Sequence, residues 1–205
     1  TLASFVGNDF SFEALCGVTG FEEDKLLETM ERMLKTGLVK ERVIRGQDVY
    51  SFADIIVRDV VHEEVSHLRH KKLHGTVGSA LEKTYAKNID EHLGELALHF
   101  LESGDKDKAL DYFMKAGEKA AKVYANSEAT SYFQSALGLL EEKEGELRER
   151  GQVLERLGDI KRLAGEFDAS IKYWNEALQL WKQLDEKETA ARLHGKMANV
   201  SWLNL

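Results

Sequence analysis

The chain contains no proline among its 205 residues. Average usage of about 5% would give roughly ten, and proline is the residue that most strongly interrupts helices and central strands. Hydrophobic residues make up 43% and charged residues 31% of the sequence, a composition typical of folded domains. The sequence therefore predicts a mainly α, folded chain that is long enough for one large domain or two modest ones.

The first 54 residues differ in pattern from the rest. A short helix capped by Ser11 is expected over residues 11–17, and an amphipathic helix closed by Gly37 over residues 22–36. Residues 38–44 and 49–52 are rich in β-forming side chains and flank a polar, glycine-containing turn, which predicts a β-hairpin. Helix, helix, hairpin is the order of a winged helix, so we predict a winged-helix domain over residues 1–54.

From residue 55 onward the apolar residues recur at helical spacing and no strand pattern remains. One long helix is expected over about 55–85, broken near Gly75 or Gly78, and residues 55–89 are predicted to be a helical linker. Short turns separate the helices that follow, which makes consecutive helices antiparallel neighbours. These helices are expected at 90–102, 106–124, 126–141, 146–164, 167–184 and 187–203.

Small and aromatic residues recur along these helices in the pattern of tetratricopeptide repeats. The best match is 151–184, where Gly158 marks a close approach of two helices and Trp174 lies between the small residues Ser170 and Ala177. Weaker copies begin near Asp90 and after residue 126, and a further copy is cut off by the chain end, so we expect a piece of a longer protein. Residues 90–205 are predicted to be an α-solenoid of tetratricopeptide-like hairpins, incomplete at the C-terminus.

The order of these parts resembles the region that follows the nucleotide-binding module in signal-transduction ATPases with numerous domains. The resemblance is carried by residues 5–15 (FVGNDFSFEAL), 50–54 (YSFAD), 97–105 (ALHFLESGD) and the pair Leu73-His74. It covers nearly the whole chain. It implies a regulatory segment, in which the winged helix relays the state of the ATPase and the repeats receive an inducer or a partner protein.

No catalytic constellation appears in the sequence, so no catalytic residue, cofactor or metal is predicted. A phosphate-binding loop is absent, because Gly195-Lys196 lies inside a predicted helix without the first glycine of that motif. His70 and His74 have the spacing to share a metal ion, but His62 and His67 do not complete a zinc motif and no third ligand is evident. A solvated helix face is the favoured interpretation of these histidines.

Charge and cysteine content restrict the partners. The net charge of -8 and the acidic helix at 22–36 argue against nucleic acid, although Lys40, Arg42 and Arg45 keep a sequence-specific DNA-binding regulator as the alternative. The single cysteine, Cys16, permits no internal disulfide, and no apolar run is long enough to cross a bilayer. A cytoplasmic protein without membrane contact is expected.

The predicted binding surface is the groove that the first helix of each hairpin lines. Its polar side chains are of mixed charge: Gln152, Glu155, Asp159, Arg162, Arg192, Asn199 and Trp202. A carboxylate-clamping Lys/Asn/Arg set is missing, because Glu155 and Asp159 occupy matching positions, so a basic or neutral peptide is expected over an acidic tail. A small-molecule inducer and self-association are further candidates, and an ordinary solvated face is the alternative.

Overall fold

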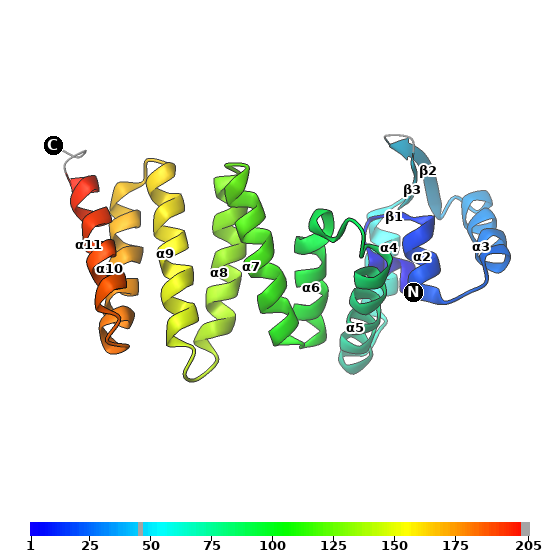
Figure 1. Ribbon diagram of the computed structural model, residues 1–205. Helices are drawn as coiled ribbons and strands as arrows, with labels where there is room; N and C mark the ends of the chain where they lie inside the picture. The colour runs from blue at the N-terminus through cyan, green and yellow to red at the C-terminus, as the bar shows by residue number, and fades with distance from the viewer. Residues whose placement is uncertain (45–46, 202–205) are drawn as a thin grey trace. The chain divides into compact units, whose positions relative to one another are not determined.

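The computed structural model describes residues 1–44 and 47–201, and these form two compact units, Thr1–Asp105 and Lys106–Leu205 (Figure 1). Helices dominate both units, and a small antiparallel sheet lies in the first. The prediction of a mainly α chain with a β-hairpin and a helical solenoid is confirmed. No helix in the described ranges has the length and apolar character needed to cross a membrane.

The first unit begins with short helices around a three-stranded sheet of order β1-β3-β2. Ser11 ends β1 and caps the following helix, because its Oγ accepts a hydrogen bond from the backbone N–H of Ala14 at 3.1 Å. Residues 45–46, which include the predicted wing residue Arg45, lie outside the described residues. The elements are α1 (Leu2–Val6), β1 (Asp9–Ser11), α2 (Phe12–Thr19), α3 (Glu23–Lys35), β2 (Val39–Ile44) and β3 (Gln47–Phe52).

The prediction of one helix over 55–85, broken at a glycine, is wrong. The chain forms α4 (Ile55–Glu63) and α5 (His67–Thr84), and the break falls at Ser66, whose backbone is extended with φ −59° and ψ 148°. Gly78 instead lies inside α5, where a Cβ would stand 3.1 Å from the Cβ of His99. The glycine therefore serves the close approach of α6 (Leu93–Ser103), which follows the short 3₁₀ helix η1 (Ile89–His92).

Residues 1–54 and 55–89 both belong to the first compact unit, since α2 packs against α5. Their division into a winged-helix domain and a linker stays a prediction. The same holds for the repeat proposed to begin near Asp90, because that segment continues into the second unit.

The second unit is a series of antiparallel helices whose bounds lie within about two residues of those predicted. Gly158 lies against the fully buried indole of Trp174, where a Cβ would be 2.3 Å from Cδ1. Ser170 is also fully buried, and its Oγ donates to the carbonyl of Gly158 at 2.8 Å. The helices are α7 (Lys106–Lys122), α8 (Asn126–Glu141), α9 (Leu147–Leu163), α10 (Phe167–Gln183) and α11 (Lys187–Ser201).

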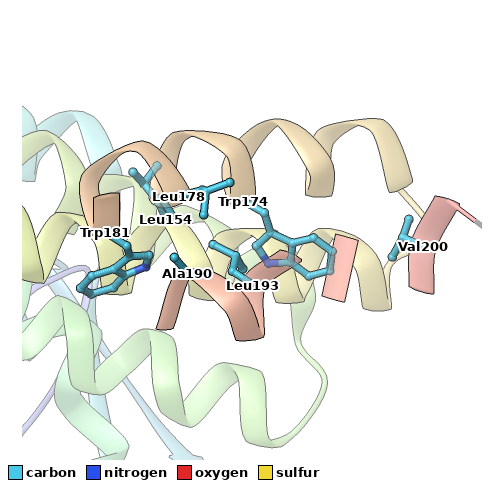
Figure 2. Close-up of a cluster of buried hydrophobic side chains, with 8 residues drawn as sticks. Leu154, Trp174, Leu178, Trp181, Ala190, Leu193 and Val200 are labelled. Atoms are coloured by element: carbon cyan, nitrogen blue, oxygen red, sulfur yellow. The ribbon is translucent and has the colours of Figure 1, made fainter. Parts of the chain in front are cut away.

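A buried hydrophobic cluster joins the last three helices of this unit (Figure 2). It combines Leu154 of α9 with Trp174, Leu178 and Trp181 of α10 and with Leu193 of α11. Each helix contributes an apolar stripe that it cannot bury alone, which is the stabilising principle of repeat arrays. The polar faces of α9 and α11 are left free to line a groove.

Candidate functional site

Two adjoining cavities lie along α7, α9 and α11 in the second unit. The first has a volume of about 390 Å³ and is lined in part by Gln152, Glu155 and Arg192. The second, of about 500 Å³, is lined in part by Arg162 and Asn199, and Asp159 borders both cavities. Six of the seven residues predicted for the groove are thus brought together. Trp202 lies outside the described residues.

Glu155 is the centre of an ion-pair network in the first cavity. Its carboxylate accepts two hydrogen bonds from Arg192, at 2.5 and 3.0 Å, and one from Lys196 Nζ at 2.8 Å. Lys196 also donates to both carboxylate oxygens of Asp159 at 2.8 Å. Burial opposes the ionisation of Glu155, but the hydrogen bonds from Arg192 and Lys196 outweigh it, so the pKa of Glu155 lies below its ordinary value.

This network removes the reason for expecting a basic partner. Glu155 and Asp159 are neutralised within the protein, and neither carboxylate is left to attract a cationic peptide. Arg162 forms no ion pair within residues 1–44 and 47–201, and Arg156 lies 3.7 Å from Glu118 in an exposed pair. The charge that remains available at the groove is positive.

Sequence reasoning missed Arg156 and Lys196 as groove residues. Helical spacing could have predicted both residues. Lys196 follows Arg192 by four residues and precedes Asn199 by three, which places all three on one face of α11. Arg156 lies beside Glu155 and three residues before Asp159 on α9. The Gly195-Lys196 pair resembles the end of a phosphate-loop motif, but Lys196 belongs to the polar face of α11 that lines the groove.

A second group of titratable side chains lies in the first unit, where His62, His70 and His74 contact one another and His99 contacts His74. His62 Nδ1 lies 3.2 Å from His70 Nε2, and His74 Nδ1 lies 3.0 Å from His99 Nδ1. The expected solvated face is therefore wrong for His62, His70 and His74, which are partly buried. His62 belongs to α4, and because the chain turns at Ser66, its ring lies beside those of α5. His67 is exposed and lies outside the group.

The histidine group is partly withdrawn from water, and this sets its protonation. Burial, together with the neighbouring His99, His70 and His62, lowers the pKa of His74 to about 3. Burial also lowers the pKa of His99 to about 4, although a hydrogen bond with the backbone of Val6 opposes the shift. These imidazoles are neutral near pH 7, and His62, His74 and His99 border a cavity of about 490 Å³.

Comparisons with known proteins assign no family to the chain, since no family model and no curated protein match it. Solved structures that resemble it include the following three. BtubC from P. vanneervenii is 13% identical with a TM-score of 0.48, and the match covers 73% of this chain and 61% of that one. MamA MSR-1 C2 is 16% identical with a TM-score of 0.30, with 73% and 99% covered.

The third similar structure is a signal transduction ATPase with numerous domains that carries a tetratricopeptide repeat sensor, from Pyrococcus horikoshii. It is 16% identical with a TM-score of 0.37, and the match covers 98% of this chain and 47% of that protein. The chain thus spans less than two thirds of BtubC and of this ATPase. All three TM-scores are below 0.5, so none of these structures indicates a function for this chain.

Proposed function

We propose that this chain is a cytoplasmic, non-catalytic regulatory and protein-interaction segment of a larger signalling ATPase, whose repeats bind a partner or inducer in the groove of α7, α9 and α11. The observation that carries the proposal is the pair of adjoining cavities on the first helices of consecutive hairpins. A groove on that face of a helical array is the usual binding surface of such scaffolds.

The chemistry of the groove favours a peptide with a carboxylate next to an apolar side chain. Arg162, which has no ion-pair partner among the described residues, supplies a guanidinium at the second cavity, and Arg156, whose pair with Glu118 is long and exposed, supplies a second one. Phe133, Ile160 and Leu163 line the same cavity and offer apolar contact. Guanidinium groups bind carboxylates with two parallel hydrogen bonds, which gives such a site geometric selectivity.

The first unit supports the regulatory part of the proposal. Its elements follow the order expected of a winged helix, with β1 added to the hairpin of β2 and β3. Ile56 and Val60 lie one turn apart on α4 and are 65% and 49% exposed, a pattern that favours contact with another domain. Arg42 of the hairpin is engaged with Asp9 at 3.1 Å, which weakens the DNA-binding alternative.

Peptide selection on the 205-residue chain tests the groove. We expect selected ligands to carry an acidic group beside an apolar residue, and Arg162→Glu or Arg156→Glu to lower their affinity by about tenfold or more. Lys172→Glu is the matched control, because Lys172 is exposed on α10 and lines neither cavity. Ligands that bind the Arg162→Glu and Lys172→Glu variants equally well would exclude this groove.

The remaining parts of the proposal are tested separately. A phosphate-loop ATPase encoded in the same reading frame would support the larger signalling protein, and a complete frame without one would contradict it. Titration with duplex DNA at low salt tests the DNA-binding alternative, for which salt-sensitive binding is required. We expect no such binding.

A further inference from the structure

We propose that His62, His70 and His74 bind one divalent transition-metal ion such as Zn²⁺, and that His99 orients His74 from behind. One ligand nitrogen from each of the three histidines lies within 4.8 Å of the other two. Zinc–nitrogen bonds of 2.0–2.1 Å in a tetrahedral site place two ligand nitrogens about 3.3 Å apart. The 3.2 Å between His62 Nδ1 and His70 Nε2 matches this edge.

The fold holds these rings in position before any ion arrives. His70 and His74 are one helical turn apart on α5, and the extended backbone of Ser66 returns His62 from α4 to the same face. Phe5 of α1 stacks on His62 with ring centroids 4.0 Å apart and meets His70 and His74 edge-on at 5.0 Å. Rings that are fixed by packing lose little further freedom when an ion binds.

The contact between His74 and His99 assigns the ligand nitrogen of His74. Two neutral imidazoles 3.0 Å apart need one N–H and one lone pair between them. Because His74 Nδ1 is engaged with His99 Nδ1, Nε2 is the nitrogen of His74 that is left for an ion, and Nδ1 then donates its N–H to His99. The lone pair of His74 is then on Nε2, and a donated second N–H is the usual support of a metal-bound histidine.

The ligand set selects the class of metal. Three imidazoles without a thiolate suit borderline ions such as Zn²⁺, Ni²⁺ or Cu²⁺, whereas Mg²⁺ and Ca²⁺ prefer oxygen ligands. The adjoining cavity of about 490 Å³, which His62 and His74 border, gives an entry path and room for water as a fourth ligand. This inference does not depend on the groove of the second unit.

Zinc titration of the full 205-residue chain, after treatment with a chelator, tests the site by calorimetry. Cobalt, which reports tetrahedral coordination by its visible absorption bands, is titrated in parallel. We expect one ion per chain, and a loss of affinity of about 100-fold or more in His62→Gln and His74→Gln. His99→Gln should weaken binding by about 10- to 100-fold, as loss of a supporting hydrogen bond does at other sites.

His67→Gln is the matched control, because His67 is exposed on the same helix and outside the histidine group. It should bind Zn²⁺ as tightly as the natural sequence, and circular dichroism reports whether each variant is folded. If a ligand variant is unfolded, imidazole ¹⁵N shifts of the natural sequence decide, since Zn²⁺ must perturb His62, His70 and His74 more than His67. No saturable binding, or equal binding in folded His62→Gln and His67→Gln, would overturn the proposal.

Discussion

In the second unit Gly158 lies against the indole of Trp174, whereas in the first unit Gly78 lies against His99 and the ring of Phe100. Both glycines let two helices approach closely. The side chains at the two contacts differ. In the second unit an apolar ring fills the contact and Ser170 donates a hydrogen bond to Gly158, whereas in the first unit the contact brings His99 next to His74. A glycine at a close helix–helix contact thus lies in a hydrophobic core in one unit and next to a cluster of histidines in the other.

The titratable groups of the two units differ in the same way. In the groove, Arg192 and Lys196 pair with Glu155 and Asp159, so charge is compensated within the protein. In the first unit the histidines contact one another, and burial lowers the pKa of His74 and His99. The comparison predicts that packing changes dominate the stability of the second unit and that pH dominates the stability of the first.

The largest effect is expected from Gly158→Ala. A Cβ at this position would lie 2.3 Å from Trp174 Cδ1 and 2.4 Å from its Nε1, and the buried ring has no room to move aside. We expect the free energy of unfolding of the second unit to fall by about 3 kcal/mol. Urea denaturation followed by tryptophan fluorescence measures it, since Trp174, Trp181 and Trp202 all lie after residue 105.

Gly138→Ala is the control for this change, because no atom lies within 4 Å of a Cβ built there. Alanine is the better helix former, so this variant should be more stable by about 0.5–1 kcal/mol. Equal stability of the two variants would show that the Gly158–Trp174 contact does not limit the helix approach.

Acidification is expected to destabilise the first unit more than the second. The pKa values of His74 and His99 lie at about 3 and about 4, below the value of 6.5 in an unfolded chain, so the folded state binds fewer protons. Stability of the first unit therefore falls as pH decreases from 6.5 towards 4, by an amount on the order of 2 kcal/mol after discounting for solvent screening of the partly exposed His74. The lowered pKa of Glu155 gives the second unit a contribution that is lost only below about pH 4.5.

Amide hydrogen exchange at pH 7 and pH 5 measures this difference, because it reports on each unit separately. Protection of α5 and α6 should decrease at pH 5 while that of α9 and α10 is retained. His99→Gln should reduce the decrease, since the variant lacks one of the titrating groups. Parallel loss of protection in both units would contradict the assignment of the pH response to the histidines.

A smaller effect is expected from Glu155→Gln. The neutral amide keeps the shape of the side chain but replaces charge-assisted hydrogen bonds to Arg192 and Lys196, at a cost of about 1.5 kcal/mol. Urea denaturation at pH 7 measures the change. Glu118→Gln is the control, because its 3.7 Å pair with Arg156 is exposed and worth less than about 0.5 kcal/mol.

The sequence predicted the helices of the second unit well because each one carries its own apolar stripe and is separated by a turn signal. Residues 151–184 were recognised from Gly158 and Trp174, which are 16 residues apart. Gly117 and Phe133 have the same spacing and make the same kind of contact, at 2.9 Å from a built Cβ, but no leucine precedes this glycine and the contact was missed.

The first unit was predicted less completely because its decisive features are tertiary. Strand β1 has only three residues and is defined by pairing with β3, for example Phe10 opposite Tyr50. No glycine or proline marks the break between α4 and α5 at Ser66. The position of His62 beside His70 and His74 depends on this break. His99 is 25 residues from His74, so only the packing of α6 on α5 reveals their contact.

The smallest effect on stability is expected from Gly78→Ala. A Cβ here would lie 3.1 Å from the His99 Cβ and 3.4 Å from Phe100 Cε1, so α6 must shift by a few tenths of an ångström. The gain in helix propensity offsets part of the strain, and we expect a loss of about 1 kcal/mol in urea denaturation. The same shift separates His99 from His74, which changes the imidazole ¹⁵N signals of both.

Gly75→Ala, where a Cβ would stand at an ordinary 3.4 Å from Ser103 Cβ, should leave these signals unchanged. Identical imidazole spectra in the two variants would mean that the glycine contact does not hold the histidine pair together.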